Sequence, residues 1–218
     1  GDSFPKPHNS LKGDEMALTL STGGSGEDFK RAPAGSHIGV CNMVADCGMQ
    51  PGSAQFPKPK RKLYIRFEIP SERVEYEKDG HKVEGPLTIG SFYTASMNEK
   101  AVLRKHLEGW RGKSFTDADA EQFDIAKILG KACMLSVIEN EKGGKTYSNI
   151  AGIGKVPKGI PEPVAENPLL YFAPDDESQF DQLPKWLQEK IEAAIVPAKP
   201  NASESHGSSD FHDDEVNF

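Results

Sequence analysis

Positively charged and aromatic side chains alternate with apolar ones in the segment 60–69. Lys62, Tyr64 and Arg66 fall on one side of an extended chain, and the residues between them are apolar. Lysine and arginine neutralise phosphates and flat rings stack on nucleobases, so these are the residue types that single-strand binding needs. The strict period of two therefore predicts a strand with one buried face and one solvent-facing, nucleic-acid-binding face.

Two further segments carry the same chemistry. One is the proline-rich loop directly before this strand, and the other surrounds the turn at Gly143 and Gly144. We expect the cations to neutralise phosphates and the rings to stack bases, at roughly 1–3 kcal/mol per stacked base. The complete predicted DNA-binding set is Phe56, Lys58, Lys60, Lys62, Tyr64, Arg66, Lys142, Lys145 and Tyr147.

The end of the chain has the opposite charge. Residues 198–218 contain one lysine and five acids, and the last residue is an aromatic one. Such a composition predicts a disordered acidic tail that either contacts partner proteins or only solubilises the chain. The expected partner-binding residues are Asp210, Asp213, Asp214, Glu215 and Phe218.

Charge and side-chain spacing limit the other functional classes. The net charge of −7 argues against a uniformly basic nucleic-acid binder, so any groove must be local. The cysteines Cys41, Cys47 and Cys133 form no C-x-x-C pair, and the histidines have no ligand-like spacing. We find no paired carboxylates or Ser/His pattern in a catalytic context. The expectation is a non-catalytic protein with no metal and no cofactor.

The order of the predicted elements indicates a fold class. Strands are expected at 37–49, 60–69 and 86–97, with a small hairpin at 73–83. Helices follow at 98–110, capped by Asn98, and at 116–129, capped by Thr116. Two more strands are expected at 131–141 and 145–156. A mainly β chain with a helical insert between strands three and four matches the OB-fold, a five-stranded Greek-key barrel.

The predicted domain organisation places this barrel between two less regular ends. Residues 1–15 resemble a remnant of an expression vector, with Met16 as the native start, and 16–36 form a flexible arm. The barrel spans 37–157, a C-terminal extension with a short helix spans 158–197, and the acidic tail spans 198–218. No apolar run approaches the roughly 20 residues of a membrane span, and unpaired cysteines suit a reducing cytoplasm.

Three segments and the chain end form a recognisable pattern: Trp110-Arg111-Gly112-Lys113-Ser114-Phe115, then Phe123-Asp124 to Leu129-Gly130-Lys131, then Lys142-Gly143-Gly144-Lys145-Thr146-Tyr147-Ser148-Asn149-Ile150, with the acidic tail ending in Phe218 as a separate match. In these segments the chain resembles phage-encoded single-stranded-DNA-binding proteins with an OB-fold. The resemblance implies sequence-tolerant DNA binding without catalysis, in replication or recombination, within the cytoplasm of an infected bacterium. It also implies that the tail recruits replication or recombination proteins; self-association stays open.

Two other classes stay open. A protein–protein adaptor or assembly factor built on a β-barrel would expose aromatic residues without basic neighbours. A nuclease or resolvase-like enzyme would need carboxylates clustered around a metal, which the spacing of acids does not indicate.

Overall fold

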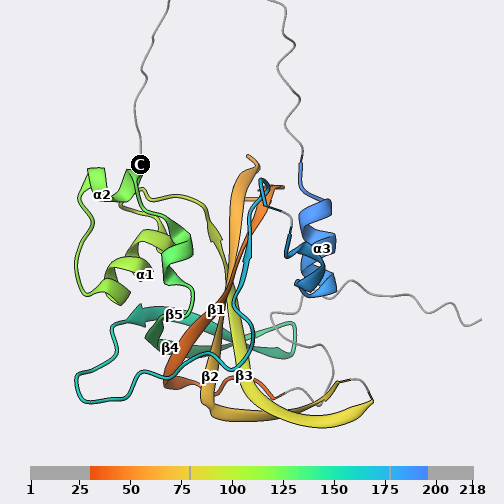
Figure 1. The fold of residues 1–218 in the computed structure, drawn as a ribbon. Coiled ribbons are helices and arrows are strands. Elements are labelled where there is room, and N and C mark those ends of the chain that lie inside the picture. Colours follow the sequence, from red (N-terminus) through yellow and green to blue (C-terminus); the bar gives the residue numbers. More distant parts are fainter. Residues whose placement is uncertain (1–29, 79, 177, 196–218) are drawn as a thin grey trace, which may run out of the picture.

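The computed structural model describes residues 30–195, apart from 79 and 177, as a mainly β protein (Figure 1). Five antiparallel strands form a sheet in the order β3-β2-β1-β4-β5, and the sheet curls into a half-barrel. The expectation of a mainly β chain with five such strands is confirmed. The strands are β1 (Gly35–Gln50), β2 (Lys60–Lys78), β3 (His81–Thr94), β4 (Ala132–Lys142) and β5 (Lys145–Gly154).

Two helices and a 3-10 turn lie between β3 and β4, where the sequence predicts a helical insert. They are α1 (Val102–Arg111), α2 (Asp117–Glu121) and the 3-10 turn η1 (Ile125–Ile128). Thr116 caps α2 by accepting a hydrogen bond from the Asp119 backbone N–H, as expected. Asn98 does not cap α1: its side chain accepts from the Lys100 N–H and forms a separate turn before the helix. The expected helix through residue 129 is broken after α2, because a short extended stretch separates α2 from η1.

The expected hairpin at 73–83 is the outer half of a longer one. β2 and β3 stay paired from Lys62 and Thr94 out to Lys78 and His81, with a register shift after Ile69. Figure 1 shows this half as a curved arm that leaves the body of the sheet. Gly80, with φ of 76°, occupies the turn in a backbone conformation that favours glycine.

The C-terminal extension is part of the sheet. β6 (Leu170–Phe172) pairs in parallel with residues 43–45 of β1, directly beyond the stretch 35–40 that pairs with β4. The 3-10 turn η2 (Phe180–Gln182) and helix α3 (Lys185–Glu192) follow. Gln50 donates to the Lys190 carbonyl at 3.0 Å, and the Ile195 N–H donates to the Met49 carbonyl at 2.8 Å, so the helix end is fastened to β1.

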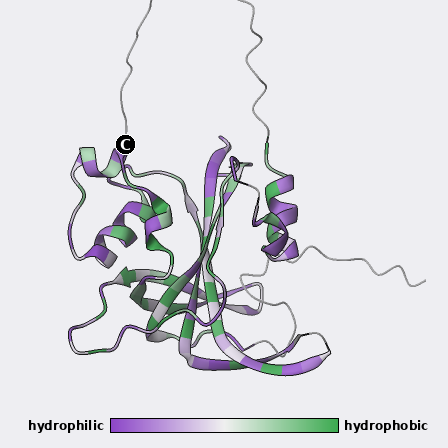
Figure 2. Cartoon of the chain, in the orientation of Figure 1, coloured by the Kyte–Doolittle hydropathy of each residue, from purple (hydrophilic) through white to green (hydrophobic). Residues whose placement is uncertain are grey.

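Both faces of the sheet are therefore covered. One core, with Phe67 and Leu135 at its centre, lies between the sheet and the helical insert, whereas a second, with Met43 and Leu187, lies under the extension. Figure 2 shows apolar and polar residues alternating along the strands and around α3. The expectation that one face of 60–69 is open to solvent is wrong, because Tyr64 and Glu68 on that face are buried.

A buried carboxylate ties the extension to the sheet. Glu68 is fully buried and accepts hydrogen bonds from Asn42 Nδ2 at 2.7 Å and from the backbone N–H groups of Glu166 and Asn167 at 2.8 and 3.0 Å. A buried charge is tolerated only when its hydrogen-bonding capacity is used in this way. None of the described helices is long and apolar enough to cross a membrane.

We predict that Leu187→Ala lowers the free energy of unfolding by about 2–5 kcal/mol, because this leucine of α3 is fully buried in the core between the helix and the sheet. Urea denaturation measures this, with Glu189→Ala on the exposed side of the same helix as the control. If Leu187→Ala lowers the free energy of unfolding no more than Glu189→Ala does, the C-terminal extension is not part of the folded core.

Candidate nucleic-acid interface

Three lysine ammonium groups gather where β2 begins and α3 ends. The pKa of Lys62 is lowered, first by partial burial and then by the nearby charges of Lys60 and Lys190. Its Nζ donates to Thr94 Oγ1 at 2.9 Å, which holds the amine at the end of β3. Amines that disfavour each other's charge create a local positive potential, which attracts anions.

Two aromatic rings lie next to Lys190. Phe92 and Trp186 are both half-buried, with ring centroids 6.2 Å apart in an edge-to-face arrangement. The Lys190 Nζ lies 5.1 Å from the centroid of Phe92, within cation–π distance. We call this surface the β2–α3 patch; it consists of Lys60, Lys62, Phe92, Trp186 and Lys190.

The loop before β2 extends the patch. Phe56 is 64% exposed, and Ser53 and Phe56 exchange backbone hydrogen bonds of 2.9 and 3.0 Å that hold the turn. The Lys60 Nζ lies 5.4 Å from the Phe56 ring, and Lys58 is exposed between them. The predicted loop residues therefore lie beside the patch, as the sequence analysis expects.

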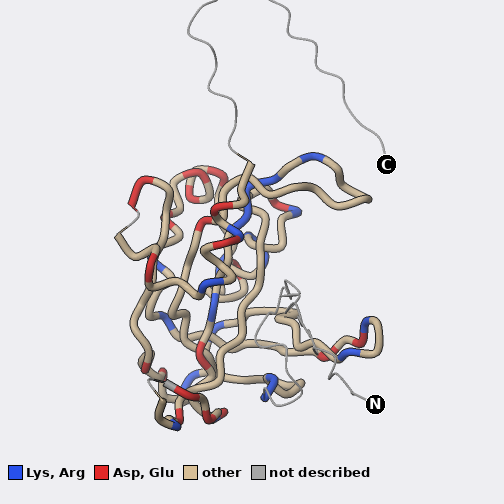
Figure 3. Tube along the Cα trace, turned by 90° about the vertical axis from the view of Figure 1, so that its right-hand side faces the viewer, with Lys and Arg blue, Asp and Glu red and all other residues tan. Residues whose placement is uncertain are grey.

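The hairpin of β4 and β5 carries a second cationic face. Lys142 is paired with Lys145, and Tyr147 is paired with Asn140, so these exposed side chains share one face. In Figure 3 the hairpin tip and the loop before β2 project toward the same side of the molecule. Among the described residues, however, no hydrogen bond or ion pair joins this face to the β2–α3 patch.

The prediction that Tyr64 stacks bases is wrong. Its side chain is only 3% exposed, with ring centroids 4.9 Å from Phe92 and 5.2 Å from Trp186. Burial raises the pKa of Tyr64 to about 12. The tyrosine thus supports the two rings of the patch from below, because α3 lies over the strand face that periodicity alone would leave open.

Arg66 is partly withdrawn from solvent, and its predicted contact with phosphates stays a prediction. The side chain is half-buried, its Nε donates to Asn42 Oδ1 at 3.0 Å, and burial lowers its pKa. Asn42 in turn donates to Glu68, so Arg66 belongs to the polar network beneath the extension. Its Nε satisfies the oxygen of a buried amide.

The sequence analysis missed three residues of the patch. The sequence analysis assigns no binding role to Phe92, Trp186 or Lys190. The spacing of four residues between Trp186 and Lys190 puts both on one helix face, and this signal could have found them.

The other reactive side chains have structural roles. Burial raises the pKa of Cys41 to about 12 and that of Cys133 further, so neither thiol is a ready nucleophile. Phe115 is buried in the main core and the partly buried Trp110 packs against that core, with Trp110 Nε1 donating to the Ala132 carbonyl at 2.7 Å. Within residues 30–195, apart from 79 and 177, no group of three or more potential metal ligands occurs.

The expected tail residues Asp210, Asp213, Asp214, Glu215 and Phe218 lie outside the described residues. Comparison with known proteins finds no protein-family model that matches the chain and no curated protein similar to it. Function must therefore be argued from the geometry of the patch.

We predict that Gly90→Ala destabilises the protein by about 1–3 kcal/mol, because an added Cβ would overlap the Tyr64 ring. Urea denaturation measures this loss of unfolding free energy, which should be smaller when Gly90→Ala is made together with Tyr64→Leu. Gly152→Ala is the control, since its Cβ would meet Ser136 at an ordinary 3.9 Å. If Gly90→Ala and Gly152→Ala lower the free energy of unfolding equally, Tyr64 does not pack against Gly90 of β3.

Proposed function

We propose that the protein binds single-stranded DNA without sequence preference, on the β2–α3 patch and the loop before β2. The observation that carries the proposal is that Lys60, Lys62 and Lys190 lie near one another and that Lys190 lies over the ring of Phe92, which packs against Trp186. Cations beside ring faces are the combination that single-strand binding requires. Every base has a π face, so stacking on Phe92, Trp186 or Phe56 would tolerate any sequence.

The strand order supports an OB-type barrel. The order β3-β2-β1-β4-β5 is that of a five-stranded Greek-key barrel opened between β3 and β5, and these two strands approach each other. In OB-folds, the face of strands two and three and the loops joining strands one to two and four to five bind oligonucleotides. The patch, the loop 51–59 and the β4–β5 hairpin occupy these positions, so Lys142, Lys145 and Tyr147 would contact the same strand farther along.

The wider role follows the resemblance to phage single-stranded-DNA-binding proteins. In this proposal the protein coats DNA during phage replication or recombination, in the cytoplasm of the infected bacterium, and performs no catalysis. The acidic tail would recruit replication or recombination proteins through its charges and Phe218.

A protein–protein adaptor is the second candidate. It is favoured by exposed aliphatic residues on the connection from β5 to β6, where Val164 is 82% exposed and Ile160 is 44% exposed. Exposed apolar side chains near one another are a feature of protein-binding surfaces. An adaptor of this kind would bind oligonucleotides no better than other acidic proteins do.

We predict that Lys62→Gln and Lys190→Gln each weaken binding of a fluorescent oligo-dT. The slope of log affinity against log salt should fall by about 0.7 for each lysine that neutralises one phosphate. Lys105→Gln, an exposed lysine on α1 with the same charge change, is the control and should leave both quantities unchanged.

Two results would count against the proposal. One is the absence of oligo-dT binding by the unchanged protein at low salt, which would leave the adaptor as the better candidate. The other is an equal loss of affinity in all three variants, which would indicate a diffuse effect of net charge.

A further inference from the structure

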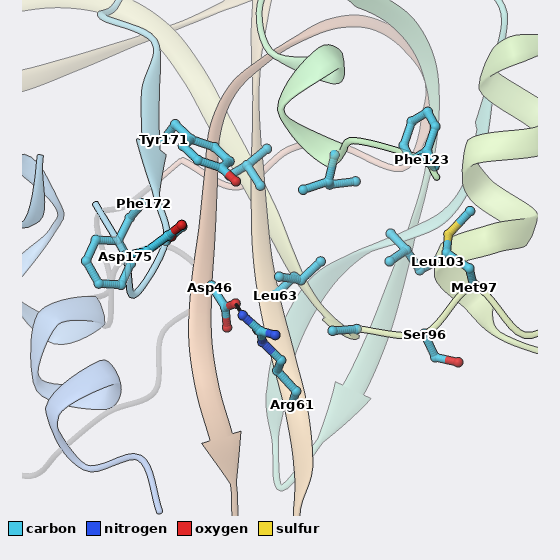
Figure 4. Close-up of a pocket in the computed structure, with 14 residues that line it drawn as sticks. Asp46, Arg61, Leu63, Ser96, Met97, Leu103, Phe123, Tyr171, Phe172 and Asp175 are labelled. Carbon is cyan, nitrogen blue, oxygen red and sulfur yellow. Dashed lines mark hydrogen bonds and ion pairs between the residues drawn. The ribbon is translucent and has the colours of Figure 1, made fainter. Parts of the chain in front are cut away.

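A pocket of about 350 Å³ opens on the other side of β2 from the β2–α3 patch (Figure 4). Arg61 and Leu63 line it, and they alternate along the strand with Lys60 and Lys62 of the patch. Its walls come from the end of β1, the start of β2, the helical insert and β6. The volume is at the lower end of the range for ligand pockets and suits one large side chain.

One end of the pocket is apolar and the other is polar. Figure 4 shows Met97, Leu103 and Phe123 on one side, with Tyr171 and Asp175 across the opening. Leu103 belongs to the main core and Phe123 packs against it, so this wall is a firm apolar surface.

The polar end carries negative charge. The pKa of Tyr171 is raised, first by burial and then by the charges of Asp124, Asp175 and Asp46. Arg61 is the lining cation, and Asp46 pairs with it through a hydrogen bond of 2.7 Å from Nε. Among the described residues, none donates a hydrogen bond to the Asp175 carboxylate or forms an ion pair with it within 4.0 Å.

We propose that this pocket is a docking site for a basic segment of another protein, which inserts one apolar side chain and places a lysine or arginine at Asp175. Charge complementarity favours this occupant: Arg61 is paired with Asp46, so Asp175 leaves the lining with one excess negative charge, which attracts a basic side chain and disfavours a phosphate. A single apolar anchor in a pocket, with charged groups at the rim, is a common basis of protein recognition. The site is separate from the proposed DNA-binding patch and does not depend on it.

The test uses a short fluorescein-labelled peptide with one phenylalanine between two lysines, titrated with the full chain and followed by fluorescence polarisation. Asp175→Asn should weaken binding about twofold to fivefold, the effect of a partly exposed ion pair. The matched control is Asp176→Asn: the neighbouring carboxylate bonds to the Ser178 N–H and does not line the pocket, so affinity should be unchanged.

A second variant tests the apolar anchor. Ala95 is exposed and lines the pocket, so Ala95→Phe should fill it and lower peptide affinity roughly tenfold. Oligo-dT affinity should be unaffected by Ala95→Phe and Asp175→Asn, which separates this site from the DNA-binding proposal.

The proposal is overturned if a peptide with glutamates in place of the lysines binds as well, or if the two aspartate variants behave alike. It is also overturned, in favour of a second copy as occupant, if sedimentation of the chain alone shows a dimer that Asp175→Asn dissociates.

Discussion

The packing of the C-terminal extension on the sheet is the interaction on which the rest of the structure depends. Leu187 is fully buried there, and Tyr64 lies under Trp186 and Phe92. The buried carboxylate of Glu68 adds a directional anchor, because its hydrogen bonds reach both β1 and the extension. Apolar burial supplies the stabilising free energy, and the satisfied carboxylate restricts where the extension can lie.

This packing also decides which charges are available to a ligand. Lys62 and Arg66 lie on the same strand face and both are half-buried, yet Lys62 donates to Thr94 at the end of β3 whereas Arg66 donates to Asn42 of the polar network around Glu68. The same helix, α3, brings Lys190 and Trp186 next to Phe92 of β3. The positive patch and the acidic pocket consequently lie on opposite sides of β2, where one strand can separate two kinds of ligand.

Much of the fold could be predicted, because the signals were local. The alternation in 60–69, the turns at Gly80 and Gly143, and the Thr116 cap each depend on neighbouring residues. The site was harder to predict. Phe56, Lys58 and Lys60 are exposed, since a proline-rich loop remains at the surface. Tyr64 was misplaced because Trp186, which covers it, lies more than 100 residues away along the chain.

By itself, the sequence determined the mainly β class, the helical insert after the third strand, and which strand carries cations and rings together. Periodicity sets these features, since a strand has only two faces and each side chain must take one. Only the tertiary structure decided that both faces are covered, that Tyr64 is a support, and that Lys190 completes the patch. The physical reason is that burial depends on contacts between distant segments, and a local pattern cannot specify which segment will supply them.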